Sequence, residues 1–153
     1  MIQSTLVILL NSKGQILLNM KKRGFGVGKY NGAGGKIMPG ESVIQGAVRE
    51  LEEETAINLS ESDLINRGVF HFYFENKPSR NQDVHLFSGL YDGNFQETEE
   101  MKPEWFDIDK IPYDLMWEDD SYWLPRILAG DEKIEYTFNF NEDGKISSFE
   151  KIQ

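Results

Sequence analysis

Residues 35–57 join a glycine-rich turn to a segment with a helical pattern of apolar and acidic side chains. In residues 43–55 the apolar side chains recur every three or four positions, which predicts an amphipathic helix packed against a core. Glu50, Glu53 and Glu54 follow the same spacing and share a neighbouring face of that helix. Glu54 lies on the flank of the apolar stripe, where a charge is costly unless something pairs with it. The stretch therefore requires a core on one side and favours a cation on the other.

The clustered carboxylates indicate a metal site. Three like charges on one helical face repel one another, and a hard divalent cation offsets that repulsion. Mg²⁺ typically takes carboxylates together with substrate phosphates. Gly46 shares the sector of the glutamates, and we expect it to leave room for metal and phosphate. The alternative, for any glutamate-rich helix, is a solvated acidic face.

The pattern extends beyond the helix and resembles a family motif. Five residues separate Gly35 from Glu41, and seven more lead to the run from residue 49 to residue 57. This spacing resembles the Nudix box, G-x5-E-x7-R-E-U-x-E-E-x-G-U, in which U is an aliphatic residue. The late glycine of the box is Ala56 here. A glycine suits a left-handed helix stop, and an alanine there is strained by about 1–2 kcal/mol, so we expect the turn to differ.

The charge along the chain is uneven. The formal net charge of −10 argues against binding of polymeric nucleic acid. Residues 1–40 nevertheless contain no Asp or Glu and carry six basic residues. A basic segment facing an acidic helix suits a small polyanion bound through a metal. The absence of cysteine excludes disulfides and thiolate metal sites.

Length and hydropathy set the expected organisation. The chain has 153 residues, so we expect a single domain spanning residues 1–153. We see no signal peptide and no membrane-spanning segment, and we therefore expect no membrane partner and a cytoplasmic location. We also expect a monomer.

The rest of the chain predicts a mixed sheet. Strands are expected at residues 5–10, 15–20, 65–74, 84–91, 105–108, 135–141 and 145–151, with an acidic loop at 96–101. A second helix is expected at 122–129, capped by Asp119, Asp120 or Ser121 and stopped at Gly130. Pro125 is tolerated only in a first helical turn, which leaves the start of this helix open. The pattern indicates an α+β fold with two main helices, and the Nudix resemblance implies an α/β/α sandwich.

Two further features concern loops and histidines. Residues 21–35 are basic and rich in glycine, so backbone N–H groups can approach phosphate closely. This segment is no Walker loop, because its Gly-Lys is not followed by Ser or Thr. His71 and His85 lie in predicted strands without the spacing of a zinc motif, and we expect both to be satisfied within the sheet.

A second constellation lies at residues 117–123, where two indoles and a phenol surround the adjacent carboxylates of Asp119 and Asp120. Aromatic side chains give a base a stacking surface worth roughly 1–3 kcal/mol. Two neighbouring carboxylates disfavour double ionisation, so one can hold a proton in a dry pocket. Such a pair offers a donor and an acceptor to the edge of a purine. The alternative is a helix cap beside core aromatics.

Residues 20–26, 31–36 and 116–123 together resemble the MutT-type branch of the Nudix family, which hydrolyses oxidised purine nucleoside triphosphates. The resemblance implies hydrolysis of 8-oxo-dGTP and 2-hydroxy-dATP to monophosphate and pyrophosphate, which cleans the nucleotide pool and avoids DNA damage. It implies a substrate site formed by Thr5, Lys21, Phe25, Asn31, Gly34, Gly35, Lys36, Trp117, Asp119 and Asp120. It implies a site for Mg²⁺, or alternatively Mn²⁺, formed by Gly34, Glu50, Glu53, Glu54 and Glu100. Its catalytic residues are expected to be Glu53, Glu54 and Arg49, with Arg49 holding a glutamate through a salt bridge.

Some residues depart from that branch and keep other functions open. Tyr30, Ala33 and the pair Met38-Pro39 replace different residues of the branch beside the glycine-rich segment, which leaves the base preference open. One alternative is the same chemistry on another nucleoside diphosphate derivative. A second is a non-catalytic nucleotide sensor, against which the complete set of glutamates argues.

Overall fold

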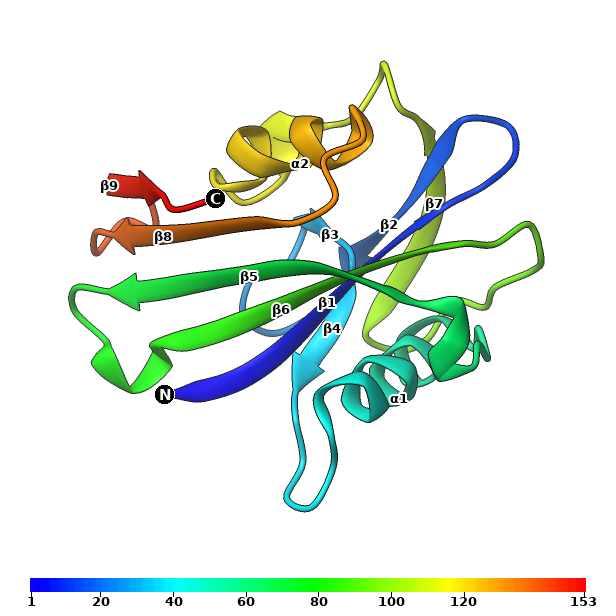
Figure 1. Ribbon diagram of the computed structural model, residues 1–153, viewed down its shortest axis with the longest axis horizontal. Coiled ribbons are helices and arrows are strands. Elements are labelled where there is room, and N and C mark those ends of the chain that lie inside the picture. Colours follow the sequence, from blue (N-terminus) through cyan, green and yellow to red (C-terminus); the bar gives the residue numbers. More distant parts are fainter.

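The computed structural model describes residues 1–153 and contains one mixed sheet of nine strands, with helices on both sides (Figure 1). The strands are β1 (Ile2–Leu10), β2 (Gln15–Lys21), β3 (Tyr30–Asn31), β4 (Ala33–Lys36), β5 (Ile65–Phe74), β6 (Gln82–Leu90), β7 (Met101–Asp107), β8 (Ile134–Phe140) and β9 (Ile146–Lys151). The helices are α1 (Val43–Thr55) and α2 (Asp120–Leu128), with short 3-10 turns at Glu61–Asp63, Pro78–Arg80 and Tyr113–Leu115. The predicted mixed sheet with two main helices is confirmed.

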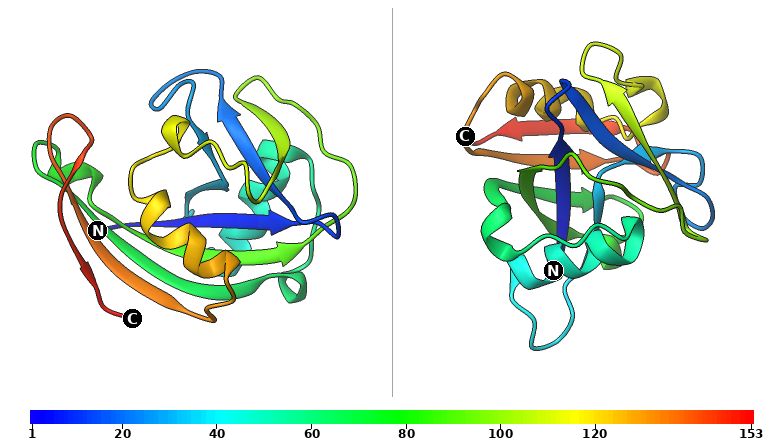
Figure 2. Two further views of the ribbon diagram at one scale, coloured as in Figure 1. Left: turned by 90° about the horizontal axis from the view of Figure 1, so that it is seen from above. Right: turned by 90° about the vertical axis from the view of Figure 1, so that its right-hand side faces the viewer.

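Strand β1 is the central element of the sheet. The strand order is β3-β2-β1-β6-β5-β8-β9, while β4 also pairs with β1 and β7 with β2. β1 runs parallel to β6 and antiparallel to β2 and β4, and β5 runs parallel to β8. Seen from the side, α2 lies above the sheet and α1 below it (Figure 2). The arrangement confirms the three-layer sandwich that the family resemblance implied.

The alternation of side chains along β1 supplies both cores. Leu6 and Ile8 belong to the apolar cluster that contains Trp123 of α2. Val7 belongs to the cluster on the opposite face, which contains Leu51 of α1. Because successive strand residues point to opposite faces, a strand buried on both sides reads as a continuous apolar run. This accounts for the run near the N-terminus of the sequence.

Strand β7 begins earlier than the sequence predicted. The strand was expected to start at Trp105 after an acidic loop, but it starts at Met101 and includes Pro103. A proline is tolerated because β7 pairs with β2 alone, so one edge of the strand needs no amide donors. The side chains of Met101 and Pro103 are buried at alternate positions, and the pattern therefore continues through the proline.

Helix α2 also departs from expectation. Pro125 is the sixth residue of the helix, so the restriction of this proline to the first turn is wrong. Burial of Trp123 and Ile127 in the core holds the helix despite the missing N–H, since packing outweighs propensity in short helices. Asp119 is the N-cap residue, but its side chain makes no capping bond. The predicted stop is confirmed, with Gly130 at φ 107°.

The turn after α1 keeps the left-handed geometry, so the expectation that it would differ is wrong. Ala56 has φ 62° and ψ 14°, and its N–H donates to the carbonyl oxygen of Glu52. The next residue, Ile57, is fully buried, and its N–H donates to the hydroxyl of Thr55. Burial of this neighbour fixes the direction of the chain, and the alanine adopts the strained conformation that the turn requires.

The prediction for the two strand histidines is confirmed. His71 contacts Asp83 of β6 and Glu135 of β8 through its two ring nitrogens, at 2.6 and 2.8 Å. His85 contacts the side-chain oxygen of Gln3 at 2.8 Å. Both histidines are satisfied within the sheet, as predicted. None of the helices has the length and apolar character that crossing a membrane requires.

Candidate active site

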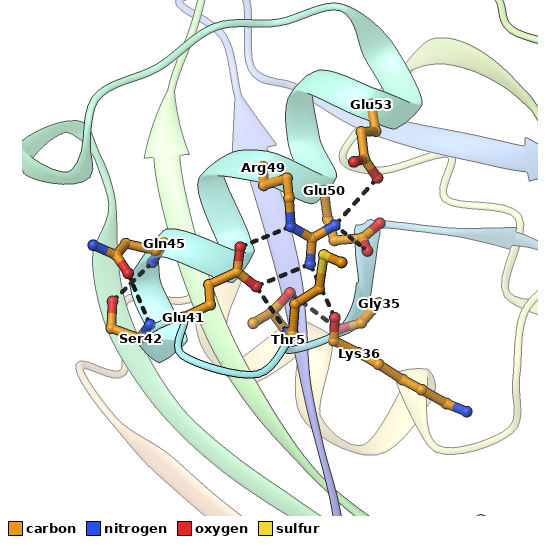
Figure 3. A network of polar contacts seen from close by, with 10 residues as sticks. Thr5, Gly35, Lys36, Glu41, Ser42, Gln45, Arg49, Glu50 and Glu53 are labelled. Carbon is orange, nitrogen blue, oxygen red and sulfur yellow. Dashed lines mark hydrogen bonds and ion pairs between the residues drawn. The ribbon is translucent and has the colours of Figure 1, made fainter.

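Helix α1 begins with a capping box that fixes its first turn. The hydroxyl of Ser42 accepts a hydrogen bond from the Gln45 N–H, and the Gln45 side chain accepts one from the Ser42 N–H. These contacts lie beside the polar network of the same helix (Figure 3). The cap therefore sets the position of the glutamates about two and three turns later.

Arg49 lies at the centre of that network (Figure 3). Its guanidinium donates to both carboxylate oxygens of Glu41, at 2.7 and 3.0 Å. It also donates to Glu50 at 2.9 Å, to Glu53 at 3.2 Å and to the carbonyl oxygen of Lys36 at 3.0 Å. The hydrogen bonds from Arg49 lower the pKa of Glu41 to about 2. As interpreted from the sequence, Arg49 positions glutamates.

Glu54 is held apart from this network. Its side chain is 9% exposed and accepts a hydrogen bond of 2.6 Å from the backbone N–H of Gly34. Burial raises the pKa of Glu54 to about 8, and the charge of Glu50 adds to the effect. No basic side chain forms an ion pair with Glu54, although Lys21 lines the same cavity. A buried carboxyl without a cation is a natural partner for a bound ion.

All five predicted metal ligands line one cavity of about 480 Å³; they are Gly34, Glu50, Glu53, Glu54 and Glu100. In the present arrangement no three acidic or histidine side chains converge closely enough to hold an ion. Arg49 contacts two of these glutamates, and Arg23 contacts Glu100 at 3.4 Å. The donor set consists of oxygen atoms and one buried, unpaired carboxyl, which fits a hard divalent cation.

Three glycines permit close approach of neighbouring elements. A Cβ on Gly35 would lie 2.6 Å from the carboxyl carbon of Glu50, and one on Gly34 would lie 1.9 Å from the carbonyl oxygen of Thr5. A Cβ on Gly46 would lie 3.0 Å from a carboxylate oxygen of Glu41. The expectation that Gly46 makes room for metal and phosphate is therefore wrong, because Glu41 occupies that space.

A second cavity of about 290 Å³ adjoins the glutamates. The structure brings all ten predicted substrate-binding residues to its wall, namely Thr5, Lys21, Phe25, Asn31, Gly34, Gly35, Lys36, Trp117, Asp119 and Asp120. Sequence reasoning missed other lining residues, including Asn19, Lys29, Phe72, Phe74, Met101 and Phe140. Phe72 and Phe74 of β5 also pack against the core that contains Phe70, and the cavity continues that face. We call this cavity the nucleoside pocket.

Aromatic rings form the mouth of the nucleoside pocket. The rings of Phe25 and Trp117 stack with centroids 5.2 Å apart, and Lys29 Nζ lies 4.9 Å from the Trp117 ring. The Arg80 guanidinium lies 4.0 Å from the centroid of Phe25, which is 58% exposed. A Cβ on Gly26 would lie 3.2 Å from the indole of Trp117. Part of the glycine-rich segment therefore packs against an aromatic wall.

The aspartate pair lies deep in the same pocket. Asp119 is 4% exposed and accepts a hydrogen bond of 2.9 Å from Trp123 Nε1, while Asp120 is 2% exposed and its Oδ2 has no partner. Burial raises the pKa of Asp119 to about 6. Burial, followed by the charge of Asp119, raises the pKa of Asp120 well above its ordinary value. The raised pKa values favour a proton on one of the two carboxyl groups, which is the donor-and-acceptor arrangement expected from the sequence.

The departures from the MutT-type pattern lie outside the nucleoside pocket, whose lining includes none of Tyr30, Ala33, Met38 and Pro39. Ala33 is buried in the core beneath α1, and Tyr30 packs edge-to-face on Phe106 at 5.1 Å. The expectation that these departures bear on base preference is therefore not supported, because Ala33 and Tyr30 pack in the core and Met38 and Pro39 are exposed.

Comparisons with known proteins agree with this geometry. A family model described as the NUDIX domain matches residues 2–127. The chain is 46% identical over 131 residues to an oxidized purine nucleoside triphosphate hydrolase of Danio rerio, covering 85% of this chain and 82% of that protein. It is 44% identical over 146 residues to the protein of that name in Mus musculus, covering 95% and 90%. Among solved structures, a MutT protein from Bacillus halodurans superposes with a TM-score of 0.85, at 25% identity, and the match covers 99% of this chain and 98% of that one.

Proposed function

Since the chain belongs to the Nudix family, we propose that it hydrolyses oxidised purine nucleoside triphosphates to the monophosphate and pyrophosphate. One observation carries the proposal: the two carboxylate sites adjoin and share part of their lining. Lys21, Gly34 and Glu54 line both the glutamate cavity and the nucleoside pocket. A nucleotide held in the pocket would therefore present its phosphates to the glutamates.

The nucleoside pocket suits an oxidised purine. Trp117 offers its indole for stacking, and Asp119 and Asp120 offer a donor and an acceptor from a dry site. Oxidation at C8 of guanine converts N7 from an acceptor into an N–H donor, so the hydrogen-bonding pattern of the base changes at its edge. A pair of carboxyl groups that holds one proton can offer an acceptor to the new N–H group. Asn31 lines the same wall of the pocket.

Nudix hydrolases use a divalent metal, and we propose Mg²⁺ here, with Mn²⁺ as the alternative. Gly34, Glu50, Glu53, Glu54 and Glu100 would hold it. A divalent cation supplies charge neutralisation at the phosphates and lowers the pKa of water that reacts with them. Release of Glu50 and Glu53 from Arg49 would make their oxygens available, while Glu41 keeps the guanidinium in place.

Glu54 is the better choice for accepting the proton of the attacking water. It is buried at the junction of the two cavities, and burial raises its pKa in the metal-free chain, so its carboxylate is a stronger proton acceptor than that of an exposed glutamate. Glu53 is more exposed and is paired with Arg49. Water forms a bond to phosphorus, the bridging P–O bond breaks, and the departing oxygen takes the electron pair. Hydrolysis in ¹⁸O-labelled water distinguishes attack at the β-phosphorus, the family expectation, from attack at the α-phosphorus.

A chromatographic product assay tests the proposal. The protein is incubated with Mg²⁺ and dGTP, 8-oxo-dGTP, dATP, 2-hydroxy-dATP, ADP-ribose or a dinucleoside polyphosphate. We expect monophosphate and pyrophosphate selectively from the oxidised purines. Turnover of ADP-ribose or the dinucleotide alone would retain the role of the glutamates and reject that of the aspartates. Binding without any turnover would instead favour the nucleotide sensor.

One alternative from the sequence loses support. Another nucleoside diphosphate substrate was suggested by departures that lie outside the pocket.

The monomeric state and the cytoplasmic location stay predictions. Size-exclusion chromatography with light scattering and localisation of a tagged chain would test them.

A further inference from the structure

Asn19 is a polar residue in an otherwise apolar run of β2. Its side chain lines the nucleoside pocket and is 2% exposed, and the three residues before it, 16–18, are buried apolar residues. Since strand side chains alternate, Asn19 points to the same side of β2 as Lys21. The strand register places it opposite Asn31 of β3 and Pro103 of β7.

The side-chain oxygen of Asn19 has no hydrogen-bond partner. Among all buried side-chain nitrogen and oxygen atoms of the chain, only Asn19 Oδ1 and Asp120 Oδ2 lack one. Both residues line the nucleoside pocket. Buried polar groups in folded proteins are almost always paired, so two exceptions in a single cavity indicate a ligand that completes them.

The neighbouring strands leave this oxygen unpaired. Pro103 has no amide hydrogen to donate. The side-chain oxygen of Asn31 accepts a hydrogen bond of 2.9 Å from the Gly32 N–H, and its amide makes none to Asn19. The N–H of Gly34 donates to Glu54. The partner of Asn19 must therefore come from outside the chain.

We infer that Asn19 is a specificity-determining residue whose side-chain oxygen accepts a hydrogen bond from an N–H group of the bound base. This inference rests on the proposed function. Phosphate oxygens are acceptors and cannot satisfy another acceptor, so the partner belongs to the nucleoside. The base is favoured over the sugar because Asn19 faces the cavity beside Asn31, within the wall that also contains Trp117 and Asp120.

A structural role and a recognition role for Asn19 predict opposite results. A buried acceptor without a donor lowers the stability of the free protein, so its removal should leave stability unchanged or raise it. The same removal should weaken binding, because a site built to hydrogen-bond its substrate discriminates through that bond. If Asn19 only supported the fold, its loss would lower stability and leave binding unchanged.

The experiment uses Asn19→Ala and Asn19→Leu, the second of which preserves side-chain volume. Binding of 8-oxo-dGMP is measured by calorimetry, hydrolysis of 8-oxo-dGTP by steady-state kinetics, and the melting temperature Tm by circular dichroism. We expect Kd and KM to rise about tenfold, corresponding to about 1.4 kcal/mol, with kcat little changed and Tm equal or higher. Ser88→Ala is the matched control, because this buried hydroxyl is paired with Arg67 at 2.7 Å outside the pocket. It should lower Tm and leave KM unchanged.

A sugar-modified ligand separates the two sources of a donor. The calorimetric binding measurement is repeated with the 2′,3′-dideoxy analogue of 8-oxo-dGMP, which lacks the sugar hydroxyl. If the Asn19 variants still bind this analogue about tenfold more weakly than the wild type does, the result supports the contact with the base. If the variants and the wild type bind it equally well, the contact with the base is overturned in favour of the sugar. Unchanged Kd and KM in both variants, with an active wild type, would overturn the inference alone. A wild type that neither binds nor hydrolyses oxidised purine nucleotides would overturn the proposed function as well.

Discussion

Glu41, beside the start of α1, and the aspartates at the start of α2 carry the same functional group in opposite environments. Around α1, Arg49 contacts Glu41, Glu50 and Glu53, and the pKa of Glu41 is lowered, whereas burial raises the pKa of Glu50 and Glu54 on the same helix. Below α2, Asp119 and Asp120 are buried without an ion pair, and their pKa values are raised. Environment therefore decides whether a carboxyl holds negative charge or a proton. One site suits a cation, and the other suits the edge of a base.

The largest expected effect concerns Glu54. Glu54→Gln removes the proposed general base and should lower kcat by about 10²–10⁴-fold, while the buried amide leaves the fold intact. Steady-state kinetics with 8-oxo-dGTP and a thermal melt measure the two effects. Glu52→Gln, an exposed position on the same helix, is the control and should retain activity. Full activity of Glu54→Gln would remove Glu54 from the chemistry.

Replacing an aspartate of the pair by asparagine should affect function less than replacing Glu54 by glutamine. A neutral amide resembles a protonated carboxyl, so Asp120→Asn should keep KM within about tenfold, whereas Asp120→Ala should raise it by about 10–100-fold. Asp131→Asn, which lies at a surface ion pair, controls for loss of an aspartate elsewhere. KM values for 8-oxo-dGTP and dGTP provide the measurement. If Asp120→Asn were as damaging as Asp120→Ala, the buried proton would be the wrong explanation.

Glu41 and the aspartate pair should affect stability in opposite directions along the pH scale. The pKa of Asp119, about 6, lies above its ordinary value of 3.8, so the folded chain binds more protons between these values. Its stabilising contribution is complete below pH 3.8 and is lost as the pH rises through 6, at about 1.4 kcal/mol per pH unit. The pKa of Asp120 is also raised, so Asp120 extends this loss of stability to higher pH. Glu41 opposes it, because its lowered pKa makes its contribution disappear as the pH falls towards 2.

Urea denaturation from pH 3 to pH 9 measures this difference. Subtracting the curve of Asp120→Asn from that of the wild type isolates the aspartate contribution, which should decline with rising pH. Glu41→Gln should remove the stability that the wild type loses on acidification. A flat difference curve for Asp120→Asn would contradict the raised pKa.

The smallest effect concerns the end of the glutamate helix. Ala56 adopts φ 62°, so Ala56→Gly should raise the free energy of unfolding by about 1 kcal/mol without changing kcat. Urea denaturation provides the measurement. Ala47→Gly, in the buried middle of the same helix, should instead lower the free energy of unfolding. Equal effects at the two positions would show that the left-handed turn carries no strain.

Sequence periodicity predicted the elements with a regular pattern. α1 and β5 match their predicted ranges, because apolar side chains recur through both. The strands β3 and β4 were missed, since they lie in a glycine-rich segment without alternation. The family motif indicated ten pocket residues, but it did not indicate Asn19 or Phe72. Their presence in the pocket depends on how β2 and β5 are placed around it, which no local pattern encodes.

The central position of β1 also determines when the site can form during folding. β1 pairs with β6, about 80 residues later in the chain, and β5 pairs with β8, about 65 residues later. Closing such long loops costs entropy before any contact is gained, so folding dominated by distant pairings is slow. Residues of the nucleoside pocket extend from Ser4 to Phe140. On the ribosome, the helix that carries the glutamates emerges early, but the pocket beside it can close only when nearly the whole chain has been synthesised.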